Sequence, residues 1–124
     1  MSNPKDVVWY LRVEQESTGS VILLTVHGRV SSLTSPELES ALAAAIASPA
    51  RGVVLDLSAV DYISSPGLGA VASASTRLSG EGRVFVVCGL RDSVSVAFSL
   101  GGLATTVTLE PSRDAALVMA ASAT

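Results

Sequence analysis

Two adjacent hydroxyl groups, those of Ser64 and Ser65, are the side chains of this sequence best placed to do chemistry. They stand in the stretch DYISSPGLGA, residues 61–70, after an apolar run and before small residues with helical spacing. A pair of serines where a strand gives way to a helix could cap the helix, act as a nucleophile, cradle a phosphate or accept one. The rest of the sequence decides among these four.

The nucleophile needs partners that the sequence does not offer. A hydrolytic serine needs a histidine as its base, and the only histidine, His27, stands roughly 40 positions before the serines. The G-x-S-x-G turn of serine hydrolases is absent, so we predict that the protein is not an enzyme. The GLG of this stretch falls short of the glycine patterns of nucleotide-binding loops.

Metal ligands are equally scarce. One histidine and one cysteine, Cys88, make a zinc site improbable. Asp56 and Asp61 lie five positions apart, and we expect them to be solvated carboxylates near a strand end. We predict neither a metal nor another cofactor. Cys88 lies within VFVVCGL, which is typical of a buried strand thiol.

Composition excludes further classes of function. The chain has 124 residues, a net charge of −3 and a single lysine, Lys5. It therefore lacks the basic patch with which proteins bind nucleic acid. No apolar run approaches the roughly 20 residues of a membrane span. The first residues lack the apolar core of a signal peptide, so we predict a cytoplasmic protein.

The elements that must position the serines follow from the apolar spacing. Residues 7–18 and 21–28 are predicted to form a hairpin about Gly19, and further strands are expected at 52–57, 83–89 and 105–110. Helices are expected at 35–48, 66–78, 92–100 and 111–122, with caps at Ser35 and Ser112. This alternation predicts one α/β domain over residues 1–124, in which helices flank a mixed, mostly parallel sheet of four to five strands.

Ser65 is predicted to be the N-cap of the helix that follows, with Pro66 as its first residue. Its hydroxyl would accept a hydrogen bond from the N–H of Gly67 or Leu68. The same position suits an anion, because a helix N-terminus carries free N–H groups and a partial positive charge. Leu68, Val71, Ala72 and Ser75 are predicted to form the core face of this helix.

These residues resemble the STAS domain, and specifically the bacterial anti-sigma factor antagonists. The resemblance runs from about residue 10 to about residue 120, and the block VVLDLSAVDYISSPGLGA carries it. It implies a partner-switching regulator of transcription that binds an anti-sigma factor with serine kinase activity. The kinase would phosphorylate Ser65, with Ser64 as second candidate, and a serine phosphatase would reverse the modification.

The resemblance also implies a partner-binding surface around the phosphorylated serine. The chain departs from the family pattern there: Ser64 replaces an aspartate, Pro66 replaces a serine or threonine, and Arg29 and Ser31 stand where acidic residues are usual. The expected surface comprises Arg29, Ser31, Ser32, Ser64, Ser65, Pro66, Gly67 and Leu68.

The departures leave a second interpretation open. The chain could be a diverged STAS module that is never phosphorylated, such as a subunit of a signalling complex or of a lipid-transport ATPase. The oligomeric state is not predicted by the sequence.

Overall fold

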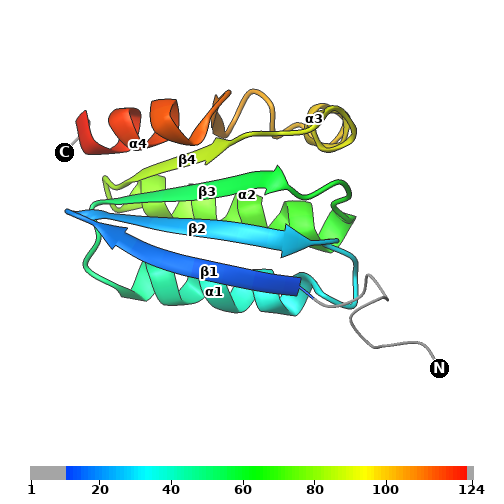
Figure 1. Ribbon diagram of the computed structural model, residues 1–124, viewed down its shortest axis with the longest axis horizontal. Helices are drawn as coiled ribbons and strands as arrows, with labels where there is room; N and C mark the ends of the chain where they lie inside the picture. Colours follow the sequence, from blue (N-terminus) through cyan, green and yellow to red (C-terminus); the bar gives the residue numbers. More distant parts are fainter. Residues whose placement is uncertain (1–10, 123–124) are drawn as a thin grey trace.

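The computed structural model describes residues 11–122. Two strands open the chain, and helices and strands then alternate (Figure 1). The elements are β1 (Leu11–Thr18), β2 (Val21–Gly28), α1 (Ser35–Ala47), β3 (Gly52–Ala59), α2 (Ser65–Gly80), β4 (Val84–Cys88), α3 (Asp92–Leu100), β5 (Thr108–Glu110) and α4 (Arg113–Ser122).

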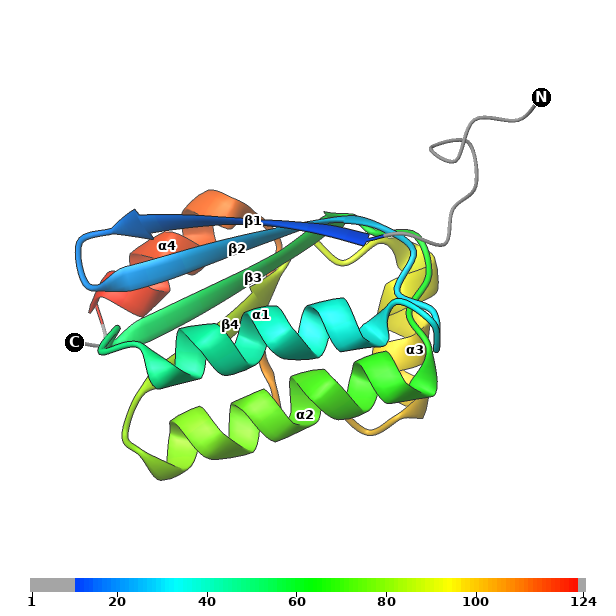
Figure 2. The same ribbon diagram turned by 90° about the horizontal axis from the view of Figure 1, so that it is seen from below.

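The strands form one sheet in the order β1-β2-β3-β4-β5. β1 pairs antiparallel with β2, and the other neighbours are parallel. Helices α1 and α2 lie side by side on one face of the sheet, and α4 lies behind the other (Figure 2). The predicted α/β fold, the hairpin and the short fifth strand are confirmed. Residues 7–10 of the predicted first strand lie outside the described residues.

Alternating side chains of β3 build two cores, one on each face of the sheet. Val53, Leu55 and Leu57 pack in the cluster that α1 and α2 cover. Val54 packs in the smaller cluster beneath α4, which also holds Cys88, so the buried strand thiol is confirmed. Burial of both faces explains why residues 53–55 of β3 are apolar without alternation.

Two of the predicted details of the helices are wrong and one is confirmed. Helix α1 has Thr34 rather than Ser35 as its N-cap, because the helix already begins at Ser35 and buries it. The core face of α2 is Gly67, Val71, Ala74 and Leu78, so the predicted face was offset and only Val71 is common to both. Ser112 does cap α4, since its Oγ accepts a hydrogen bond from the N–H of Ala115 at 3.1 Å.

Arg83 joins β4 to the end of α1. Its guanidinium donates to the backbone carbonyls of Ile46 at 2.7 Å, Ala50 at 2.8 Å, Ser48 at 3.0 Å and Ala45 at 3.2 Å. These include carbonyls that the last turn of α1 cannot pair internally. One side chain from a distant strand therefore completes the C-terminus of this helix.

Among residues 11–122, no helix has both the length and the apolar character needed to cross a membrane.

Candidate functional site

The two adjacent serines occupy different environments at the start of α2. Ser64 is buried, has an extended backbone and is the N-cap, because its Oγ accepts a hydrogen bond from the Gly67 N–H at 3.3 Å. Ser65 is the first residue of the helix and is exposed. The prediction that Ser65 is the cap was wrong by one residue, because the helix begins before Pro66 rather than at it.

The hydroxyl of Ser65 has no hydrogen-bond partner among residues 11–122. Pro66 has no N–H, and the N–H groups of Gly67 and Leu68 are paired with the side chain and the carbonyl of Ser64. Ser64 therefore performs the structural task of a cap, and Ser65 is left available to solvent.

A backbone bridge holds the loop before α1 against the start of α2. The N–H of Val30 donates to the carbonyl of Tyr62 at 3.0 Å, and the N–H of Ser64 donates to the carbonyl of Val30 at 2.7 Å. Gly67 sits on this bridge, and a Cβ atom there would lie 2.6 Å from Cγ1 of Val30. Glycine is thus required for α2 to approach the loop closely.

This bridge places residues 29–32 beside Ser65, and the loop is held together internally. Thr34 Oγ1 donates to the carbonyl of Arg29 at 2.6 Å and accepts from the N–H of Ser31 at 2.9 Å. Ser31 Oγ accepts from the N–H groups of Leu33 and Thr34. The side chain of Ser31 therefore shapes the loop, and its neighbour Ser32 is exposed.

The segments that meet at the start of α2 carry exposed apolar side chains, which sequence reasoning missed. Leu33 is 76% exposed, and Tyr62 is 41% exposed with the Arg29 guanidinium 4.4 Å from its ring centroid. Leu100, at the end of α3, is 85% exposed. Helix α3 lies beside the start of α2 (Figure 2), where Leu68 is half-buried. The only signal in the sequence was a leucine within a loop of serines.

A second polar cluster lies on the opposite face of the sheet, beneath the start of α4. Arg113 Nε donates to Asp56 Oδ2 at 2.9 Å, and Arg113 Nη2 donates to Thr25 Oγ1 at 2.9 Å. Burial opposes ionisation of Asp56, but the N–H of Ser58 and the Arg113 guanidinium outweigh it and hold its pKa below the usual value. Asp56 is therefore a buried strand residue, and the prediction of a solvated carboxylate was wrong for it; Asp61 is exposed.

The other reactive groups predicted from the sequence lie apart from the serines. His27 Nε2 is 2.8 Å from Glu14 Oε1 on β1, so the histidine has a carboxylate partner. Burial, with a contribution from Asp56, raises the pKa of the Cys88 thiol to about 12, which leaves it protonated. No group of three histidine, cysteine, aspartate or glutamate side chains that could hold a metal ion occurs among residues 11–122.

The exposed serine at the start of a helix, on a sheet of this order, defines a class of protein. The chain belongs to the STAS domain family, whose model matches residues 12–116.

Two relatives are more specific. The chain is 31% identical over 106 residues to the "Putative anti-sigma factor antagonist BtrV" of Bordetella bronchiseptica, a match that covers 86% of this chain and 91% of BtrV. It is 30% identical to an anti-sigma factor antagonist from Mycobacterium paratuberculosis, with a TM-score of 0.84 over 98% of this chain and 99% of that one.

A third relative is similar in fold only. The cell fate determinant SpoIIAA of Bacillus, solved in its phosphorylated form, is 13% identical, with a TM-score of 0.68 over 87% of this chain and 98% of that one.

Proposed function

We propose that this chain is an anti-sigma factor antagonist that works by partner switching. In this proposal it binds an anti-sigma factor with serine kinase activity and so frees the sigma factor. Phosphorylation of Ser65 ends the complex, and a serine phosphatase restores it. Two relatives at 30% identity or more, both named as anti-sigma factor antagonists, support the proposal. The proposed site of action is the cytoplasm, where sigma factors work.

The observation that best supports this proposal is that the two serines have different environments and different roles. Ser64 caps α2 from a buried position, whereas the hydroxyl of Ser65 is exposed and unbonded within the described residues. A kinase can reach Ser65 without unfolding the helix start. Modification of Ser64 would break its bond to Gly67, so we assign the modification to Ser65.

A phosphate group on Ser65 would be tolerated by the fold and felt by a partner. It would bring about −1.5 to −2 charges to the positive end of α2, where helix dipole and anion attract each other. The same charge would lie beside the exposed Leu33 and Tyr62, which an apolar partner surface would otherwise cover. Docking would weaken while the fold stayed intact.

The proposed partner surface divides into contacts and supports. Ser32, Ser65 and Pro66 are exposed and available for contact, as are the neighbouring Leu33 and Tyr62. The guanidinium of Arg29 stacks on the ring of Tyr62 and so holds that ring in position for contact with a partner. The remaining residues of the predicted surface, Ser31, Ser64, Gly67 and Leu68, are half-buried or buried and hold the contact residues in place.

Paired baits test the proposal. Ser65→Ala and Ser65→Glu versions of the chain are incubated in lysate of the source organism, and captured proteins are identified by mass spectrometry. We expect an ATPase of the histidine-kinase-like fold on the alanine bait and at least tenfold less of it on the glutamate bait. Ser79→Glu, an exposed serine at the far end of α2, is the matched control and should capture the ATPase normally.

Equal capture on both baits would contradict the switch and favour the second candidate, a constitutive STAS interaction module. The presence of Pro66 favours this second candidate. The proline directly after Ser65 restricts the backbone conformation that a kinase can bind. Phosphate found on Ser65 in cells would remove that candidate.

A further inference from the structure

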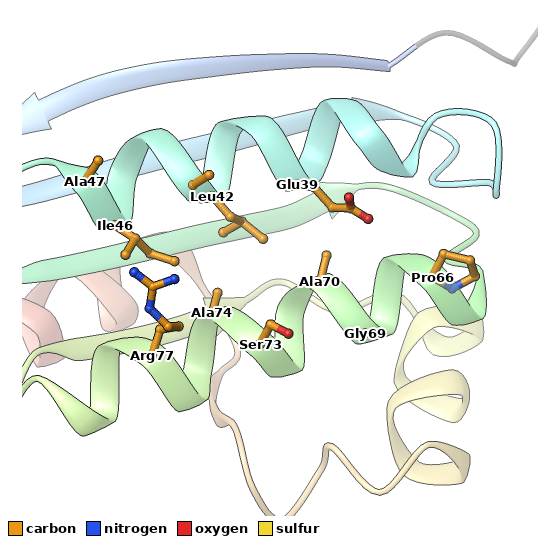
Figure 3. Close-up of a pocket in the computed structure, with 11 residues that line it drawn as sticks. Glu39, Leu42, Ile46, Ala47, Pro66, Gly69, Ala70, Ser73, Ala74 and Arg77 are labelled. Carbon is orange, nitrogen blue, oxygen red and sulfur yellow. The ribbon is translucent and has the colours of Figure 1, made fainter.

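A groove of about 670 Å³ runs between α1 and α2 on the face of the sheet opposite α4 (Figure 3). Its floor contains the buried side chains of Leu42 and Ala74. Pro66 lines one end, directly after the proposed phosphorylation site, and Arg77 lines the other. The groove therefore starts at the proposed partner site and leads away from it along the helices.

Between Glu39 and Arg77, the walls of this groove carry no charged side chain. Residues 41–47 of α1 and residues 65–76 of α2 contain no charged side chain. Ala43, Ala47 and Gly69 line the groove and are exposed. Exposed faces of helices are normally polar, so a groove whose middle part is uncharged indicates a surface that a partner covers.

The two ends of the groove carry opposite charges. Glu39 lies toward the end that Pro66 lines, and Arg77 reaches across the other end toward Ile46 (Figure 3). Neither side chain forms an ion pair within the part of the chain that the structure describes. A matching ligand would bring a basic group to Glu39 and an acidic group to Arg77.

We propose that this groove binds one amphipathic helix of the anti-sigma factor that contacts Ser65, running antiparallel to α1 and α2; this inference rests on the proposed function. An antiparallel helix would begin at Arg77 and end at Glu39. Acidic residues favour the start of a helix and basic residues its end, so this direction supplies both complementary charges where a helix most readily carries them. The charges at the two ends of the groove thus favour one direction of the bound helix.

The length of the ligand follows from the groove. The axial rise from Pro66 to Arg77 is about 16 Å at 1.5 Å per residue, so a helix of about three turns fills it. Small wall residues such as Ala43 and Gly69 allow close approach of the two backbones, and apolar side chains of the ligand at helical spacing would contact Leu42 and Ala74.

A second copy of this chain does not supply the required pattern. Helices α1, α3 and α4 have an acidic residue in the first turn but no basic residue in the last. Helix α2 has Arg77 in its last turn and no acidic residue in its first. Among the described helices, none therefore presents an acid at its start and a base at its end.

Photocrosslinking tests the groove proposal separately from the proposed function on which it rests. The photoreactive residue p-benzoylphenylalanine is placed in the Ser65→Ala chain at Ser73 in the groove, at Leu33 beside the serine, or at Thr76. Thr76 is exposed on α2 outside the groove and serves as the matched control. Cross-linked peptides from lysate of the source organism are then mapped by mass spectrometry.

We expect position 73, but not position 76, to cross-link to a helix of an anti-sigma factor with an acid at its start and a base at its end. Cross-links to the anti-sigma factor from position 33 alone would overturn the groove proposal and leave the proposed function standing. A cross-link from position 73 to a second copy of this chain would also overturn it. No anti-sigma factor at either position would overturn the proposed function and, with it, this inference.

Charge variants give a second measurement on the purified pair. Glu39→Arg should weaken binding several-fold, whereas Glu37→Arg, at an exposed glutamate outside the groove, should leave it unchanged. Arg77→Glu should weaken binding several-fold, whereas Arg51→Glu, an exposed arginine outside the groove, should leave it unchanged. Equal effects of the groove and control variants, with unfolding midpoints preserved, would contradict the proposal.

Discussion

The starts of α2 and α4 lie at the same edge of the sheet and use their polar groups in opposite ways. At the start of α4, Arg113 donates hydrogen bonds to Asp56 and Thr25, so its guanidinium is paired within the fold. At α2, Ser64 serves the helix while the neighbouring Ser65 hydroxyl stays unbonded within residues 11–122. The comparison teaches that a polar group without an internal partner is the one available for regulation.

The largest expected effect is at the start of α4. Among residues 11–122, Arg113→Ala leaves the buried carboxylate of Asp56 with the Ser58 N–H as its one hydrogen-bond donor, and we expect a loss of about 2–3 kcal/mol in the free energy of unfolding. Chemical denaturation measures it, with Arg12→Ala as control, since the Arg12–Glu14 pair is exposed and contributes within about 0.5 kcal/mol. Capture of the partner should survive, and equal stability of the two variants would contradict the assignment.

Acid should erase part of what Asp56 contributes. Folding lowers the pKa of Asp56 below 3.8, so its ionised form stabilises the protein above that pH, and the contribution is lost as the pH falls through the folded-state pKa. The difference in unfolding free energy between the wild type and Asp56→Asn should therefore shrink below pH 3.8. A difference that stays constant on acidification would show that ionised Asp56 is not favoured in the fold.

A smaller effect is expected at the glycines of α2. Gly67→Ala would place Cβ 2.6 Å from Val30 Cγ1, and we expect a net loss of about 1–2 kcal/mol. Gly69→Ala meets no atom within 4 Å and should stabilise the helix by up to about 1 kcal/mol. Thermal unfolding of the two variants should thus shift in opposite directions, and a shared direction would refute the close approach at Gly67.

The smallest effects separate the two serines. Ser64→Ala removes the N-cap and should cost about 1 kcal/mol. Ser65→Ala removes an exposed, unbonded hydroxyl and should change stability by less than about 0.5 kcal/mol. Urea denaturation measures both, and a larger loss for Ser65→Ala would restore the original prediction that Ser65 is the cap.

The sequence predicted the fold better than it predicted the contacts. Apolar runs such as residues 53–55 of β3, and the alternation of helices and strands, were sufficient to predict the sheet and its helices. The cap at Ser64 was missed because Pro66 is acceptable at either of the first two helical positions, which leaves the start of α2 open by one residue. Spacing placed Leu68 in the core, and Leu68 is half-buried and packs against it; the spacing did not predict that Gly67 is the buried residue that meets Val30.

Contacts between distant segments could not be predicted at all. The bond between Arg113 and Asp56 joins residues 57 positions apart, and no local pattern records it. The same holds for Leu33, whose exposure depends on where the bridge between Val30 and Ile63 sets the loop. Local periodicity describes which face of an element is apolar, whereas such pairs depend on how the elements meet.

The guanidinium of Arg83 also has a consequence for the order in which the chain is made. The carbonyl of Ile46 that it binds is synthesised 37 residues earlier. At typical elongation rates of about 5–20 residues per second, the end of α1 waits about 2–7 s for this partner. During that interval the end of α1 lacks the hydrogen bonds from Arg83, and they form when residue 83 has been synthesised. Translation speed through residues 47–83 therefore sets how long the first half of the domain remains unfinished.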